Sequence, residues 1–195
     1  MRRGACWRSA GNREDIMKKT LIVYHSRTGN TRHVAQALAR RLDADLDEIR
    51  IVQPMGGALG YAACAIEAIA GLTPALRPMR RDPTAYERVV IGTPVWFWNL
   101  SSPVRSWLAR HRRLRGRVAF FCTMGGSGAQ RVFAAMAELL RKQPVATLAL
   151  TDAQIEAGFD DRLAAFVQSL QTPRRVVRVG SATRGRASKP AGAAA

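Results

Sequence analysis

The stretch HSRTGNT, residues 25–31, stands between an apolar run and a helical pattern. The run LIVY at 21–24 precedes it, and Val34, Leu38 and Leu42 follow at the spacing of one helix face. The chain therefore turns from a strand into a helix through small polar residues. Those residues either cap the helix or use their hydroxyl and backbone N–H groups to bind an anion.

The same alternation of strand and helix continues along the chain. Apolar runs predict strands at 20–24, 46–52, 88–91, 118–122 and 145–150, with 46–52 at the edge of the sheet. Helical periodicity predicts helices at 30–42, 58–70, 103–110, 129–141 and 160–170. Five strands alternating with five helices predict an α/β fold with a parallel sheet covered on both faces.

Length and composition indicate one globular domain of 195 residues, of which 47% are apolar. We expect residues 1–16 to be a disordered or mis-started leader, 17–171 to be the domain and 172–195 to be a disordered basic tail. No apolar run is long enough to cross a bilayer, and the leader lacks the apolar region of a signal peptide. We therefore expect a cytoplasmic protein.

The cysteines and histidines show no metal-binding pattern. Cys6, Cys64 and Cys122 are far apart in the sequence, which fits a reducing compartment. The three histidines do not supply zinc-ligand spacing either. No combination of serine, cysteine, histidine and aspartate indicates nucleophilic catalysis, so we name no catalytic residue.

The net charge of +17 is unevenly distributed. Residues 1–18 carry five basic and two acidic side chains (+3), residues 19–171 carry twenty and twelve (+8), and residues 172–195 carry six and none (+6). About half of the excess thus lies on segments that we do not expect to fold, and nucleic acid is not an expected partner. The densest run, 110–117, is either a docking patch or a set of cations at a helix C-terminus; we prefer the second interpretation.

Three connections are expected at the carboxyl edge of the sheet, where such folds bind ligands. They are HSRTGNT, TPVWFWNLSSP at 93–103 and TMGGSG at 123–128. The first has no acidic residue between 26 and 31 that would repel an anion. The second offers aromatic rings, unless these pack as core beneath the loop. The third offers main-chain N–H groups, unless it is only a flexible turn.

Taken together, S-x-T-G-N-T at 26–31, G-T-P-V-W at 92–96 and the Gly/Ser-rich loop resemble the flavodoxins. More narrowly, residues 19–171 resemble the small flavodoxin-like flavoproteins of bacteria. The resemblance implies a three-layer α/β/α flavodoxin-like fold with a five-stranded parallel sheet in the order 2-1-3-4-5. It also implies FMN, bound without a covalent bond and used for redox chemistry. The short connection before the last helix resembles that of short-chain flavodoxins.

The resemblance also implies three sets of cofactor-binding residues, with Trp96 as the ring that stacks on the flavin. The phosphate loop would be Ser26, Arg27, Thr28, Gly29, Asn30 and Thr31. The two loops beside the isoalloxazine would be Thr93, Pro94, Val95, Trp96, Phe97, Trp98 and Asn99, and Thr123, Met124, Gly125, Gly126, Ser127 and Gly128.

The charge of the domain departs from the family. Flavodoxins that carry single electrons are typically acidic, whereas residues 19–171 are basic. The resemblance implies either electron transfer to a redox partner protein or reduction of a small quinone-like acceptor with NAD(P)H. The alternative is a basic module that keeps the fold without flavin and binds nucleic acid or an acidic protein.

Overall fold

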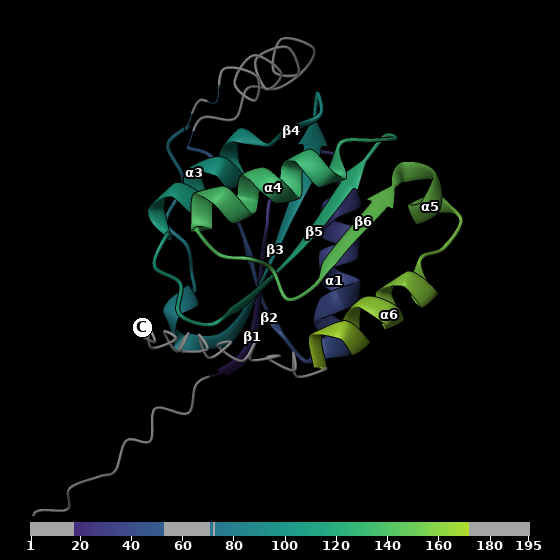
Figure 1. Cartoon of the computed structure of the whole chain (residues 1–195), viewed down its shortest axis with the longest axis horizontal. Helices are drawn as coiled ribbons and strands as arrows, with labels where there is room; N and C mark the ends of the chain where they lie inside the picture. Colours follow the sequence, from purple (N-terminus) through teal and green to yellow (C-terminus); the bar gives the residue numbers. More distant parts are fainter. Residues whose placement is uncertain (1–17, 53–70, 72, 172–195) are drawn as a thin grey trace, which may run out of the picture.

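The computed structural model describes residues 18–52, 71 and 73–171 (Figure 1). The predicted helix at 58–70, the leader and the tail lie outside the described residues. The strands are β1 (Lys18–Tyr24), β2 (Asp45–Glu48), β3 (Tyr86–Trp96), β4 (Asn99–Leu100), β5 (Arg117–Met124) and β6 (Thr147–Thr151). The helices are α1 (Asn30–Leu42), α3 (Ser102–Arg110), α4 (Ala129–Leu140), α5 (Asp152–Glu156) and α6 (Asp160–Gln171), with a 3-10 turn, η1, at Pro83–Ala85.

The parallel strands lie in the order β2-β1-β3-β5-β6, and β4 pairs antiparallel with the end of β3. With the five parallel strands numbered by themselves, this is the predicted order 2-1-3-4-5, which is confirmed. The order reverses between β1 and β3, whose pairing runs from Lys18 beside Tyr86 to Tyr24 beside Gly92. The carboxyl ends of these two strands therefore open the crevice in which open α/β sheets bind ligands.

Two apolar layers hold the sheet between the helices, because successive side chains of a strand point to opposite faces. On one face Leu21, Val89 and Phe120 pack with residues of α3 and α4, among them Trp107 and Met136. On the other face strand residues pack with α1 and α6. Figure 1 shows α3 and α4 on one side of the sheet and α1 and α6 on the other. The described helices include none that is long and apolar enough to cross a membrane.

The structure corrects the limits of two predicted strands. β2 ends at Glu48 rather than at 52, because its neighbour β1 ends at the paired residue Tyr24. β3 continues to Trp96, so Thr93 to Trp96 are strand residues and not the predicted loop. Pro94 is tolerated there because β3 no longer pairs with β1 beyond Gly92, so one side of the strand needs no N–H donor.

Three short elements were absent from the sequence-based prediction: η1, β4 and α5. β4 folds back on β3 through a two-residue turn, Phe97-Trp98, in which both residues have positive φ angles of 49° and 59°. Such turns normally use asparagine and glycine, so the sequence carries no signal for this one. α5 did have a signal: Thr151 and Gln154 form a reciprocal capping box, in the pattern T-x-x-Q.

Candidate functional site

Contacts between side chains and backbone bring the three predicted segments together at the carboxyl edge. The His25 N–H donates to the carbonyl of Gly92 (3.2 Å), which ties the first segment to the second. The Trp98 indole N–H donates to the Ser127 hydroxyl (2.9 Å), which ties the second to the third. A hydroxyl pair, Thr31 with Thr123 (2.8 Å), ties the first to the third. The segments therefore form one site, as the topology requires.

In the first segment, Ser26 organises the turn into α1. Its Oγ accepts from the backbone N–H groups of Gly29 and Arg32, both at 3.2 Å. A hydroxyl that accepts twice still has its own hydrogen to donate. Gly29 has φ 109°, a left-handed conformation that favours glycine, and its carbonyl begins the helix by accepting from His33 (2.8 Å). The first turn of α1 has no acidic residue, so its positive end is available to an anion.

Not every predicted side chain is presented to a ligand. The hydroxyl groups of Thr31 and Thr123 are almost completely buried in their mutual hydrogen bond. Thr93 is also buried and hydrogen bonds the carbonyl of Pro94 and the hydroxyl of Ser101. These three threonines connect the elements beneath the site, whereas Thr28 is exposed.

Asp152 belongs to the site although no motif named it. Its Oδ1 accepts from the Asn30 side-chain amide at 2.7 Å. Its Oδ2 lies 4.0 Å from the position that a Cβ on Gly125 would take. The carboxylate thus stands between the first and third segments at the end of β6. The capping-box pattern that starts α5 was the signal that could have placed Asp152 at this edge.

The hairpin tip places aromatic rings at the rim of the site. Phe97 and Trp98 are 40% and 57% exposed, unusual values for residues of this size. Their left-handed backbone costs free energy in non-glycine residues, and such strain clusters at functional sites. The tip is fixed by the Trp98–Ser127 bond and by the Asn99 amide, which donates to the carbonyl of Phe97 at 2.7 Å.

Trp96 occupies a different place from Trp98. Its ring meets His25 edge to face, with the centroids 5.6 Å apart. The Nδ1 of His25 hydrogen bonds the carbonyl of Ile49 (2.9 Å), which assigns the hydrogen to Nδ1. Burial, the largest cause, lowers the pKa of His25, so the imidazole stays neutral near neutral pH. That Trp96 stacks on a cofactor stays a prediction, and Trp98 becomes a second candidate for that role.

A cavity of about 300 Å³ lies between the hairpin and the third segment. It is lined by Val95, Phe97, Trp98, Met124, Gly125, Gly126 and Ser127. Cys122 precedes this loop, but burial raises the pKa of its thiol to about 12, which keeps it protonated and unreactive. The cavity therefore combines aromatic surface with exposed main chain, and no reactive side chain lines it.

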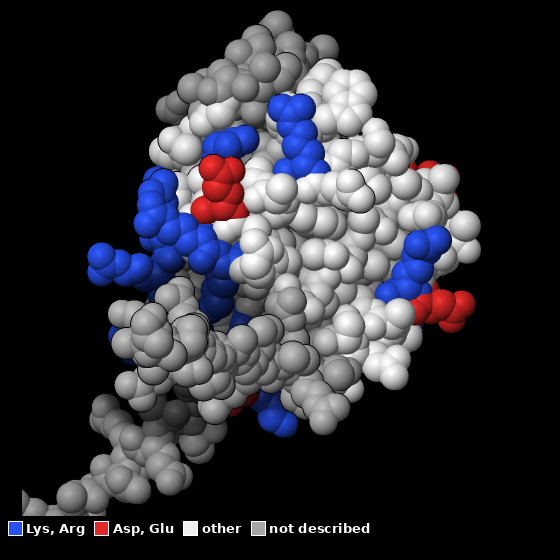
Figure 2. Space-filling model, in the orientation of Figure 1, with Lys and Arg blue, Asp and Glu red and all other residues white. Residues whose placement is uncertain are grey.

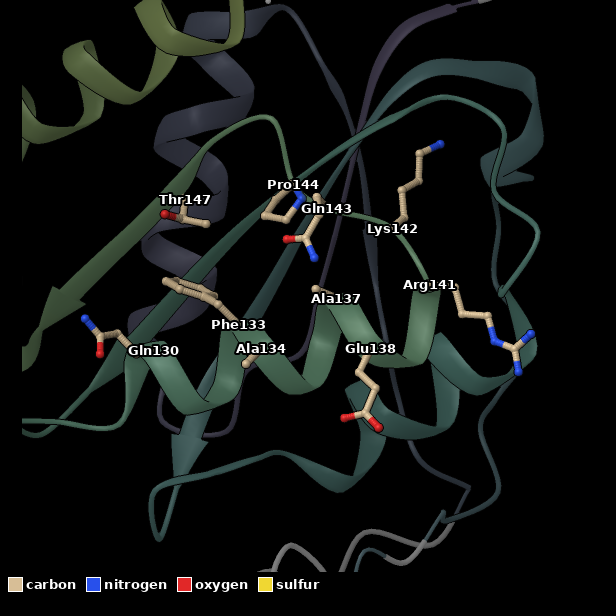
Figure 3. A pocket seen from close by; sticks show the side chains of 10 residues that line it. All are labelled: Gln130, Phe133, Ala134, Ala137, Glu138, Arg141, Lys142, Gln143, Pro144 and Thr147. Carbon is tan, nitrogen blue, oxygen red and sulfur yellow. The ribbon is translucent and has the colours of Figure 1, made fainter. Parts of the chain in front are cut away.

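A larger hollow, of about 750 Å³, lies along α4 and the start of β6. Figure 3 shows that its side chains come from the helix and the following loop and point in different directions. Phe133 and Pro144 give it an apolar wall, and the basic residues Arg141 and Lys142 lie at one end. None of its lining residues comes from β1, β3 or the segments that follow them, so we place the candidate site at the carboxyl edge.

The fold and this site define an α/β protein with a cavity of aromatic rings and exposed main chain at the carboxyl edge of its parallel sheet. Comparison with known proteins gives the family: the flavodoxin family model matches residues 19–168, and the chain belongs to that family. No curated protein sequence matches the chain.

Solved structures agree with this family assignment. A flavoprotein from Lactobacillus acidophilus NCFM, solved in complex with FMN, is 25% identical with a TM-score of 0.59, covering 72% of this chain and 97% of its own. A protein from Bacteroides uniformis ATCC 8492 is 20% identical with a TM-score of 0.66, covering 77% and 98%. Flavodoxin 2 from Bacillus cereus is 18% identical with a TM-score of 0.50, covering 77% and 96%. The last two show similarity of fold alone.

Proposed function

We propose that this chain binds FMN at the carboxyl edge and uses it to reduce a planar, quinone-like acceptor with electrons from NAD(P)H. The family match and the FMN complex of the Lactobacillus relative support the cofactor. When bound, FMN accepts and passes on electrons, and the protein supplies binding and orientation.

The observation that carries this proposal is the pair Gly125-Gly126. Neither glycine has a positive φ angle, so the backbone conformation does not require glycine. A Cβ at Gly126 would meet no atom within 4 Å, and one at Gly125 would meet only Asp152, at 4.0 Å. Neither conformation nor packing within the described residues explains two adjacent glycines here. A flat group lying against the main chain of the cavity does explain them.

The remaining residues fit the other parts of FMN. The Ser26 hydroxyl and the first N–H groups of α1 are suited to hold its phosphate, because α1 presents donors and no acid there. Phe97 and Trp98 supply flat apolar surface in the wall of the cavity. The chain's own contribution is thus to bind and orient the cofactor and to exclude water from one side of it.

The exposed aromatic tip favours a small planar acceptor, because Phe97 and Trp98 remain accessible at the rim of the cavity. The second candidate function is electron transfer to a redox partner protein. The basic charge of residues 19–171 weighs against the acidic docking surface of typical electron carriers.

Titration of the apo-protein with FMN, followed by flavin fluorescence, tests the binding site. Thr28→Glu adds a negative charge to the exposed phosphate loop and should weaken binding at least about a hundredfold, as expected for repulsion of a desolvated anion. Gln36→Glu adds the same charge at an exposed position further along α1 and is the matched control. Absence of FMN binding by the folded wild type, or equal losses in both variants, would refute the proposed site.

Turnover distinguishes the two candidate functions. The FMN-loaded protein is mixed with NADPH or NADH under anaerobic conditions, and the flavin absorbance is followed before and after a quinone is added. Rapid reduction by the nicotinamide and rapid reoxidation by the quinone support the reductase. A flavin that NAD(P)H does not reduce leaves electron transfer between proteins as the better explanation.

A further inference from the structure

The loop between α3 and β5 is built to expose arginines. Arg112, Arg113 and Arg115 are exposed, whereas Leu114, between them, is 8% exposed and packs into the core. At Gly116 a Cβ would lie only 2.6 Å from the carbonyl oxygen of Tyr86, so the loop is pressed against the start of β3. The arginines therefore stand on an anchored backbone, at the amino edge of the sheet.

Lys142 anchors the same loop from the other side. Its ammonium donates to the carbonyls of Leu114, Arg115 and Gly116. One ammonium group thus satisfies three backbone carbonyl groups of the loop. The loop thus presents mainly positive groups outward, and its negative carbonyl ends turn toward Lys142.

The helix dipole does not account for these charges. α3 ends at Arg110 with the C-cap at His111, and the dipole acts within about one turn of the helix end. Arg110 complements it, but Arg112, Arg113 and Arg115 lie beyond the cap. Within the described part of the chain, none of these three forms an ion pair. The interpretation preferred from the sequence, that these cations complement a helix C-terminus, therefore fits Arg110 alone.

The positive surface extends onto the helices beside the loop. A hollow of about 330 Å³ between α3 and α4 is lined by Arg105, Arg112 and Arg141 with one acid, Glu138. Figure 2 shows basic side chains gathered over the carboxyl ends of α3 and α4, with an acidic group among them. We call this hollow and the loop 111–116 the arginine surface.

Both ends of the described domain lie at this edge. β1 begins with Lys18 paired with Tyr86, and Arg88, two residues further on, donates to the carbonyl of Leu170 in the last turn of α6 (3.1 Å). The segments that continue from these ends are also basic. Residues 1–17 hold four basic and two acidic side chains, and residues 172–195 hold six and none.

We propose that the arginine surface binds nucleic acid through its phosphates. Guanidinium groups suit phosphate, which they can bind with two parallel hydrogen bonds. A protein partner would need apolar anchors at the centre of its interface. The exposed large hydrophobic residues of the described chain are Val52, Phe97 and Trp98, and Phe97 and Trp98 lie at the opposite edge. This inference departs from the sequence-based expectation because it now rests on anchored arginines that form no ion pair with any other described residue.

The test measures binding of a short fluorescein-labelled DNA duplex to the full chain by fluorescence anisotropy at several salt concentrations. The variant R112Q/R113Q/R115Q keeps Leu114, Gly116 and Lys142, so the loop remains anchored. We expect the dissociation constant to rise at least about tenfold. The logarithm of the association constant decreases linearly with the logarithm of the salt concentration. The steepness of this decrease should become smaller by roughly 2 to 3, for three lost phosphate contacts.

The control variant R40Q/R131Q/R162Q removes the same charge from exposed positions on α1, α4 and α6. It should change the dissociation constant less than about threefold. Equal losses in the two variants would mean attraction by net charge alone and would overturn the proposal. Failure of the wild type to bind DNA at low salt would also overturn it, as would tighter binding of labelled polyglutamate than of DNA.

Discussion

The two edges of the sheet both carry a glycine in a loop, but for opposite reasons. At the amino edge, Gly116 is required by packing, because any side chain would strike the backbone of Tyr86 and Glu87. At the carboxyl edge, Gly126 faces open space. The first glycine serves the fold, and the second leaves room for a ligand. The surroundings differ accordingly, with exposed aromatic rings at one edge and exposed arginines at the other.

The largest effect is expected from Gly116→Val, which forces side-chain atoms to within 2.6 Å of a backbone oxygen. We expect the free energy of unfolding to fall by about 3 kcal/mol, the upper range for overpacking. Urea denaturation measures this loss. Unchanged stability would show that the loop moves freely and that the contrast between the two glycines is wrong.

Gly126→Val is the matched change at the other edge. The variant should keep the wild-type free energy of unfolding within about 0.5 kcal/mol, because the new Cβ meets no atom within 4 Å and the residue is exposed. FMN affinity should nevertheless fall at least about a hundredfold, measured by fluorescence titration. Unaltered FMN binding in this folded variant would show that Gly126 does not leave room for the flavin, and would contradict the main argument for the proposed site.

Lys142→Met tests the anchor of the arginine surface while keeping an unbranched side chain that is one heavy atom shorter. Three carbonyls lose a charged donor, so we expect a loss of about 1–2 kcal/mol in the free energy of unfolding. DNA affinity should fall and FMN affinity should not, because the two edges are separate. Urea denaturation and the two titrations check this, and a fall in FMN affinity would contradict the separation.

The smallest effect concerns His25, whose pKa is lowered by burial from its ordinary 6.5. The unfolded chain therefore binds more protons below pH 6.5, and the free energy of unfolding should fall as the pH decreases through that range. His25→Asn can still donate to Ile49 but does not titrate. Urea denaturation at pH 7.5 and 5.5 should give a pH-dependent difference between wild type and variant of roughly 1 kcal/mol or less. Equal pH dependence in both would contradict the buried, neutral state of His25.

Most of the fold could be predicted from the sequence. α1 lies where periodicity places it, at Asn30–Leu42, and the parallel strands follow the predicted order. Local signals were strong for the elements themselves, because continuous apolar runs and helical spacing agree with burial on both faces, whereas the strand order came from the resemblance to the flavodoxins. The ends of β2 and β3 were less predictable, since they depend on where the neighbouring strand stops.

The candidate site was also only partly predictable from the sequence. The sequence located its three segments, because the carboxyl ends of parallel strands must meet at one edge. It could not separate the buried hydroxyl pair Thr31–Thr123 from the exposed Thr28, nor bring Asp152 to Asn30 across 122 positions of the chain. Those distinctions depend on packing between distant segments.

By itself, then, the sequence determined the layers of the sheet, the edge of the candidate site and the excess of positive charge. The layers and the charge follow from periodicity and composition, and the edge follows from the rule that parallel strands end together. Only the tertiary structure decided which glycine is crowded and which is open, and which arginines beyond the helix end form no ion pair with another described residue. Both depend on atoms that come from other elements, because a side chain's space and partners are set in three dimensions.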